Sequence, residues 1–198
     1  IIAVHGKENI DSTIIGRMVA IKKPKKLPAV DQEIMVLGKD HEIWRNNGIE
    51  AFTSTPVYRG GRVYSTIKRG ELVCLDANTG EEHWVLKLAP DQIHASPTWA
   101  DGKLYVPMFN GKVFVVVDEG EKGNILSEID LGSACLAAPA VAHGRVFVQS
   151  KKMLFCFGSG EDAPAFVAKP KENLKHIHEG PPKGQAVSLQ VVPAEFTL

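Results

Sequence analysis

SPTWADGKLYVPMFNGKVFVVVDEGEKGNILSEIDLGSACLAA, residues 96–138, decides the fold because it repeats the stretch before it, STPVYRGGRVYSTIKRGELVCLDANTGEEHWVLKLAPDQIHA, residues 54–95. One proline recurs in each unit, and the three are spaced 41 and 42 residues apart: Pro56, Pro97 and Pro139. A glycine followed by a basic residue and an apolar pair recurs as well: Gly61, Gly102 and Gly144. The chain is therefore a tandem repeat of short apolar strands.

A repeat of about 41 residues with several strands per unit is typical of a β-propeller blade. The first unit predicts four strands, at Thr55–Tyr58, Arg62–Lys68, Glu71–Asp76 and Glu82–Leu88. The second predicts strands at Ser96–Trp99, Lys103–Met108, Lys112–Asp118 and Asn124–Leu131. Asp101-Gly102 and Asn110-Gly111 are two-residue hairpin signals between them. The sequence therefore predicts an all-β fold, a partial propeller of four-stranded antiparallel blades.

The remaining residues divide around these two blades, 54–95 and 96–138. Residues 1–53 predict an incomplete, divergent blade, and residues 139–158 predict a partial one. Residues 159–186 are rich in Pro, Gly and charge and predict a linker. Residues 187–198 look like the first strand of an immunoglobulin-like module. Since propellers close with about 4–8 blades, we expect the rest of a longer chain, or further copies, to complete the ring.

Two motifs resemble one propeller family in particular. Asp76–Trp84, DANTGEEHW, follows an apolar strand, and Ser96–Val106 reads SPTWADGKLYV. Both are similar to the repeat of the pyrroloquinoline-quinone-like (PQQ-like) propellers. That family includes quinoprotein alcohol dehydrogenases, which hold PQQ with Ca²⁺, and cofactor-free members such as the lipoprotein of the outer-membrane assembly machinery. The resemblance implies a bacterial protein of the periplasm or cell surface.

Composition excludes some kinds of partner. Lys and Arg together number 23, and so do Asp and Glu. The net charge therefore favours binding to neither nucleic acid nor membrane. No apolar run approaches the ~20 residues of a membrane-spanning helix. The basic run at residues 22–26 is interpreted as a solvated loop. Cys74, Cys135 and Cys156 lack metal-ligand spacing and are expected to be small buried apolar residues.

Few residues suggest a functional site. Asp91, Gln92 and His94 lie in the connection between the two full blades, and we expect them to face the central channel. Three tryptophans are expected to pack between blades: Trp44, Trp84 and Trp99. The acidic turn at 76–81 is read as a turn rather than a calcium loop. The cluster at residues 176–179, HIHE, lies in the expected linker and is not read as a zinc site.

These observations predict no catalytic residue, metal ligand or cofactor-binding residue. The favoured hypothesis is a non-catalytic exported scaffold that binds a protein partner. The alternative is a fragment of a PQQ-dependent oxidoreductase of the alcohol dehydrogenase type, with its cofactor ligands outside this chain. No vicinal Cys-Cys pair, which the resemblance associates with many such enzymes, is present.

Overall fold

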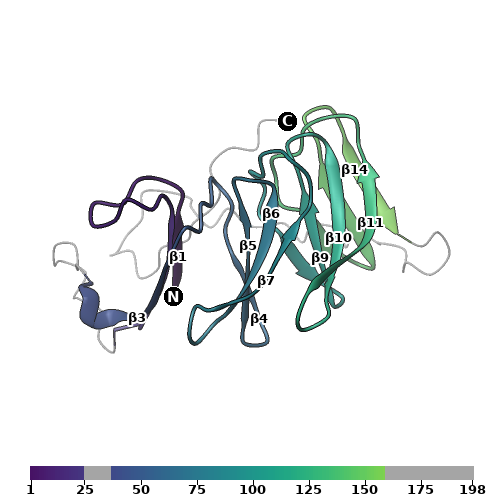
Figure 1. Cartoon of the computed structure of the whole chain (residues 1–198). Helices are drawn as coiled ribbons and strands as arrows, with labels where there is room; N and C mark the ends of the chain where they lie inside the picture. The colour runs from purple at the N-terminus through teal and green to yellow at the C-terminus, as the bar shows by residue number, and fades with distance from the viewer. Residues whose placement is uncertain (25–36, 159–198) are drawn as a thin grey trace, which may run out of the picture. The chain divides into compact units, whose positions relative to one another are not determined.

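The structure, a computed structural model, describes residues 1–24 and 37–158, all within one compact unit, Ile1–Pro164. Within these residues the regular structure is β apart from one 3-10 turn, Lys39–His41. The strands form four antiparallel sheets, which we call blades 1 to 4 (Figure 1). The all-β prediction is confirmed. The expected linker and immunoglobulin-like strand lie outside the described residues.

The two central blades each have four strands in sequence order. Blade 2 contains β4 (Val57–Arg59), β5 (Arg62–Ile67), β6 (Glu71–Asp76) and β7 (Glu82–Lys87). Blade 3 contains β8 (Thr98–Ala100), β9 (Lys103–Pro107), β10 (Lys112–Asp118) and β11 (Gly123–Asp130). All eight predicted strands are present.

The flanking blades each have three described strands. Blade 1 contains β1 (Ile2–His5), β2 (Arg17–Ile21) and β3 (Glu42–Asn47). Blade 4 contains β12 (Ala140–Ala142), β13 (Arg145–Gln149) and β14 (Leu154–Gly158). By order within the repeat, blade 1 has the second, third and outer strands, whereas blade 4 has the first three.

The first hairpin of each repeat is a tight turn. Both central residues of the turn between β8 and β9, Asp101 and Gly102, have positive φ, at 48° and 69°. This pair of angles matches a type I′ turn, whose twist suits the flanking strands. The predicted hairpin at Asp101-Gly102 is confirmed.

The second hairpin of blade 3 differs from its prediction. Its strands end at Pro107 and restart at Lys112, and Gly111 alone of the intervening residues has positive φ, at 91°. The Met108 amide donates to the Lys112 carbonyl at 2.8 Å and the Gly111 amide to the Met108 carbonyl at 3.1 Å, so the loop is the three residues between Met108 and Lys112. The two-residue prediction at Asn110-Gly111 was wrong, because the turn includes Phe109 and closes with Gly111 in the left-handed conformation.

Each central blade buries both of its faces. In β6, Val73 and Leu75 pack with Met18 and Trp44 of blade 1. The alternate residues, Leu72 and Cys74, pack with residues of blade 3: Leu104, Val106, Phe114 and Val116. Adjacent residues of a strand point to opposite faces, so this alternation places one set against each neighbouring blade.

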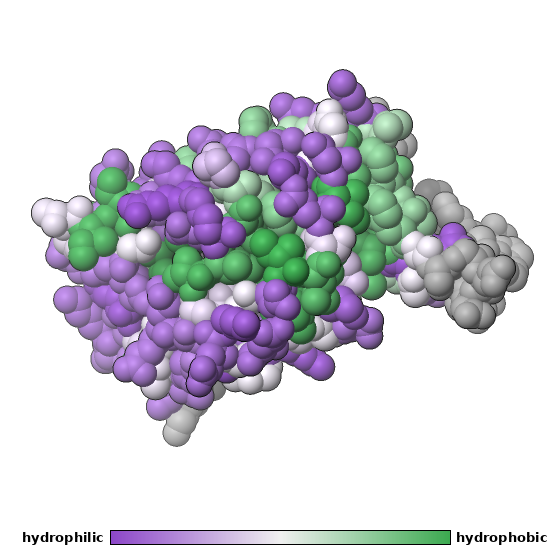
Figure 2. Space-filling model, turned by 45° about the vertical axis from the view of Figure 1, so that its right-hand side comes forward, coloured by the Kyte–Doolittle hydropathy of each residue, from purple (hydrophilic) through white to green (hydrophobic). Residues whose placement is uncertain are grey.

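The contact between blades 3 and 4 is less complete. Its fully buried members are Val113, Cys135 and Val148. An apolar hollow of about 300 Å³ remains between the two sheets, lined by residues that include Tyr105, Val115, Val146 and Phe157. Leu154, on the opposite face of β14 from Phe157, is 69% exposed, and Figure 2, in which the right-hand side of Figure 1 comes forward, shows hydrophobic surface between hydrophilic stretches.

One prediction about cysteine burial was wrong. Cys74 and Cys135 are buried as expected, but Cys156 is exposed. Cys156 lies in β14, which pairs with β13 and with no other described strand. Phe157, its neighbour in β14, packs toward blade 3, so Cys156 points to the opposite face of blade 4, against which no other described sheet packs.

We predict that Gly70→Ala destabilises the chain far more than Gly102→Ala. Both glycines have positive φ, at 75° and 69°, so alanine is strained by about 1–2 kcal/mol at either site. A Cβ at Gly70 would lie only 1.8 Å from the Ala89 carbonyl oxygen, whereas one at Gly102 would meet nothing within 4 Å. Urea unfolding of both variants measures the difference, and equal midpoints would contradict the contact between hairpin and connection.

Candidate functional site

The second hairpin of each repeat contacts the connection that enters its blade. The same backbone hydrogen bond occurs three times, from the amides of Lys68, Phe109 and Lys151 to the carbonyls of Glu50, Gln92 and Ala134, at 2.9, 3.2 and 2.8 Å. These donors occupy equivalent places in the repeat, spaced 41 and 42 residues apart. We call this end of the blades the connection face.

Three rings form a row across the connection face. The His94 ring lies 5.3 Å from the Phe52 ring and 5.4 Å from the Phe109 ring, centroid to centroid. Lysines lie over both ends of the row. The Lys68 ammonium is 5.7 Å from the centre of the Phe52 ring, and the Lys151 ammonium is 5.2 Å from that of Phe109. These distances are within the ~6 Å range of a cation–π contact.

His94 is fixed in place by its neighbours on both sides. Thr53 donates its hydroxyl to the His94 carbonyl at 2.8 Å and lies 3.4 Å from Nδ1. The His94 Nε2 lies 3.0 Å from Gln92 Oε1, and the Gln92 amide donates to Asp91 Oδ1 at 2.7 Å. Asp91, Gln92 and His94 therefore lie together on this face. That they face a central channel stays a prediction.

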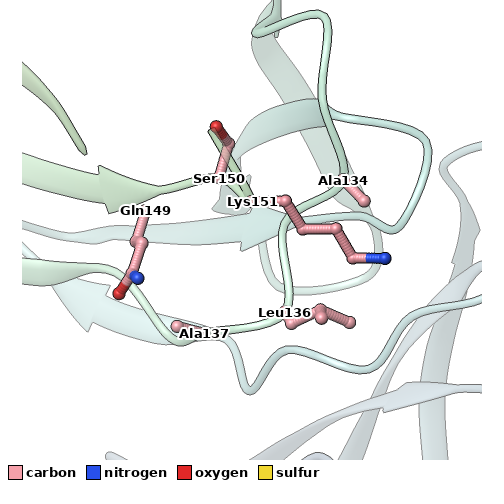
Figure 3. A pocket seen from close by; sticks show the side chains of 6 residues that line it. All are labelled: Ala134, Leu136, Ala137, Gln149, Ser150 and Lys151. Carbon is pink, nitrogen blue, oxygen red and sulfur yellow. The ribbon is translucent and has the colours of Figure 1, made fainter. Parts of the chain in front are cut away.

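A hollow of about 230 Å³ adjoins the Lys151 end of the row (Figure 3). It is lined by Ala134, Leu136, Ala137, Gln149, Ser150 and Lys151. Leu136 is 46% exposed, and the Lys151 side chain extends beside it in Figure 3. The hollow thus combines an apolar floor with polar groups from β13 and the hairpin that follows.

Sequence reasoning found the His94 connection but missed Phe52, Phe109 and the two lysines. A signal for them exists, because Lys68, Phe109 and Lys151 align in the repeat just as the prolines do. The three positions differ in residue type although the backbone bond is the same. Such variation at one column of a repeat indicates a surface that is not needed for packing.

A second polar cluster lies between blades 2 and 3, around Asp118. Its carboxylate accepts hydrogen bonds from the Tyr64 hydroxyl at 2.6 Å, Trp84 Nε1 at 3.1 Å, and the amide of Gly120 at 2.8 Å. It also forms an ion pair with Arg62, whose Nη1 lies 3.0 Å from Oδ2. The side chain of Asp118 is only 8% exposed. This cluster ties the second and outer strands of blade 2 to the third strand of blade 3.

The charges of this cluster shift several pKa values. Burial favours the neutral form of Asp118, but the hydrogen bonds from Tyr64, Gly120 and Trp84 and the charge of Arg62 outweigh it and lower its pKa. Burial and the hydrogen bond to Asp118 raise the pKa of Tyr64. Burial raises the pKa of the Cys74 thiol to about 11. The tyrosine and thiol are therefore neutral at pH 7, and the cluster is structural.

The tryptophans are engaged in contacts between blades. Trp44 and Trp84 are 8% and 5% exposed, and Trp44 Nε1 donates to the Ala77 carbonyl at 2.8 Å. Trp99 is half-buried and stacks on Tyr64 of the preceding blade with ring centroids 5.3 Å apart. Truncation of a buried Trp to Ala generally costs about 3–5 kcal/mol.

No described residues form a group of three or more His, Cys, Asp or Glu that could hold a metal ion. The Asp76 carboxylate instead accepts from the amides of Asn78 and Thr79, at 2.8 and 2.9 Å, and these bonds lower its pKa. The cluster at residues 176–179 lies outside the described residues.

Comparison with known proteins supports the fold. The model of one family, described as outer membrane protein assembly factor BamB, matches residues 29–123. The crystal structure of BamB from Moraxella catarrhalis is similar with a TM-score of 0.56 and 14% identity, covering 79% of this chain and 49% of that one. The computationally designed Ika4 protein is similar with a TM-score of 0.52 and 17% identity, covering 60% of this chain and 73% of that one.

Two further comparisons carry less weight. A quinohemoprotein alcohol dehydrogenase from Pseudomonas putida HK5 has a TM-score of only 0.46 at 18% identity, over 53% of this chain and 18% of that one. No curated protein matches the chain. This chain spans about half the length of the BamB structure.

Sheets of this order, packed face to face with a repeated hairpin-to-connection bond, define a β-propeller repeat protein. With the family match over residues 29–123 and the BamB structure as a neighbour, the chain is more particularly similar to PQQ-like β-propeller repeat proteins. Among the described residues, no helix is long and apolar enough to span a membrane.

We predict that Asp118→Asn lowers the free energy of unfolding at pH 7 by about 1–3 kcal/mol, because an amide cannot accept from all of these donors. The pKa of Asp118 is lowered in the folded state. Its stabilisation is therefore complete above the unfolded pKa of about 4 and is lost as pH falls below it. Urea unfolding between pH 3 and 7 checks this.

The matched control is Asp101→Asn, because the Asp101 side chain is 87% exposed and pairs with Lys103 alone. The difference in stability between wild type and Asp118→Asn should narrow on acidification, whereas any difference for Asp101→Asn should be much smaller at every pH, because solvent screens its exposed pair with Lys103. A difference for Asp118→Asn that stays constant down to pH 3 would contradict the assigned charge.

Proposed function

We propose that this chain is a non-catalytic, exported scaffold that binds a protein partner through its connection face and blade edges. The observation that carries the proposal is the row of rings on the connection face. Phe52 and Phe109 are 42% and 37% exposed although each contacts His94. Contiguous exposed apolar groups rimmed by charge are typical of protein interaction sites.

The groups on this face suit binding better than catalysis. The Thr53 hydroxyl lies 3.4 Å from His94 Nδ1 but donates its proton to the His94 carbonyl at 2.8 Å, so the ring does not accept it as a base would. Aromatic rings and aliphatic side chains supply contact area, and the lysines supply a charged rim. Fold alone does not fix function, so the proposal rests on this site rather than on the propeller.

The proposed location is the periplasm or the cell surface. The matched family is described as an outer membrane protein assembly factor, which supports work in the bacterial envelope. The blade edges offer a second binding mode, since β14 pairs with β13 alone among the described strands. An unpaired edge can accept an added strand.

We predict that Phe109→Ala abolishes most capture of a specific partner from envelope extract of the source organism. Its matched control is Tyr58→Ala, because Tyr58 is 65% exposed but lies in β4, next to the first hairpin at the other end of blade 2. Removal of a central aromatic anchor costs about 2 kcal/mol or more in many interfaces. Immobilised wild-type and variant chains, with bound proteins identified by mass spectrometry, provide the readout. Identical bound proteins for all three chains would refute binding at this face.

We also predict that the chain binds its partner without a cofactor. Titration with PQQ in the presence of Ca²⁺ should leave the tryptophan fluorescence without a saturable change. The expectation follows from the packing of Trp44 and Trp84 between blades. Saturable, Ca²⁺-dependent quenching together with dye-linked alcohol oxidation would instead favour the oxidoreductase alternative.

A further inference from the structure

The proposed function does not specify the chemistry of the partner. The side chains of the connection face indicate that chemistry. The lysines at the two ends of the ring row are exposed. Lys68 has one acidic neighbour, Glu50, at 3.8 Å, and its side chain is 49% exposed. Lys151 forms no salt bridge among the described residues, although its ammonium lies over Phe109. Both ammonium groups can therefore accept a carboxylate from outside the chain.

The rings between the lysines are tilted rather than parallel. The His94 ring makes interplanar angles of 50° with Phe52 and 60° with Phe109. The lysine ammonium groups already lie over the two phenylalanine rings. Single-stranded nucleic acids need open ring faces on which bases stack. The tilted rings of this face instead offer edges, which favours a peptide over a nucleic acid.

The row of rings can accommodate an extended chain. Successive rings are 5.3 and 5.4 Å apart. Side chains on one face of an extended peptide repeat every roughly 7 Å, which is longer than the ring spacing. Alternate side chains of such a peptide would therefore lie between rings as well as over them, while the residues between them would lie on the outer side, where the exposed lysine side chains can reach them.

The hollow beside Leu136 gives the peptide an anchor point. Its volume of about 230 Å³ is below the roughly 300–1,000 Å³ of pockets that enclose a drug-sized ligand. It therefore fits a single large apolar side chain. Ala134 and Leu136 would contact that side chain, and Gln149 offers an amide at the opposite side (Figure 3).

We propose that the connection face binds an extended acidic peptide segment that carries aromatic or large aliphatic side chains at alternate positions. The segment lies along Phe52, His94 and Phe109, its carboxylates pair with Lys68 and Lys151, and one apolar side chain enters the hollow beside Leu136. This inference rests on the proposed function, because it names the chemistry of the partner at the same site.

The test uses three fluorescein-labelled twelve-residue peptides in which phenylalanine alternates with glutamate, serine or lysine. Fluorescence anisotropy with the full chain measures each affinity. We expect the Glu/Phe peptide to bind at least about tenfold more tightly than the Lys/Phe peptide. Its affinity should fall as the NaCl concentration is raised. The Ser/Phe peptide should fall between them.

Charge reversal then locates the site. The double variant Lys68→Glu, Lys151→Glu should lower the affinity for the Glu/Phe peptide by about tenfold, because two modest attractions become repulsions. The control is Lys122→Glu, since Lys122 is 73% exposed and pairs with Glu119 in the β10–β11 hairpin. Both variants change exposed side chains, and a shared unfolding midpoint with the wild type verifies that they fold.

Two results would overturn the inference. One is equal affinity for the Glu/Phe and Lys/Phe peptides, and the other is an unaltered affinity in the double variant. Binding of oligothymidylate in place of the peptides would assign the row to nucleic acid. If envelope capture still depends on Phe109 but is insensitive to the double charge reversal, the proposed scaffold function stands and the acidic partner is rejected.

Discussion

A four-stranded sheet with two apolar faces is unstable alone, and this constraint governs the whole molecule. The alternation in β6 gives each face its own partners, Val73 and Leu75 toward blade 1, Leu72 and Cys74 toward blade 3. The outer-strand tryptophans extend this contact, because Trp84 lies against Gly123, where a Cβ would come within 2.9 Å of the indole. Blades must therefore stack, and stacking fixes where every hairpin and connection lies.

Stacking converts equivalent repeat positions into a shared surface. The amide at residues 68, 109 and 151 makes the same bond each time, so these positions are fixed in space by backbone alone. Their side chains are then free to vary without loss of the fold. Loops on a rigid scaffold commonly carry function for this reason. Lys68, Phe109 and Lys151 of the ring row occupy these variable positions.

The two aspartates that end β6 and β10 show how context changes a repeated residue. Asp76 accepts from amides of its own turn, whereas Asp118 also accepts from Tyr64 and Trp84 of the preceding blade. In a low-dielectric contact between blades, such a carboxylate is stabilised only when its acceptor capacity is fully used. The same repeat position thus serves a local turn in one blade and a contact between blades in the next.

From the sequence alone one can derive the period, the blade strands, the Asp101-Gly102 turn and the placement of Asp91, Gln92 and His94 in one connection, because periodicity and turn chemistry are local properties of the chain. Only the tertiary structure brings Phe52 and Phe109 to either side of His94 and exposes Cys156. It also joins the Phe109 amide to the Gln92 carbonyl of the connection. These outcomes depend on how one blade packs against the next, and residue spacing within a repeat does not encode which side chains of different repeats meet.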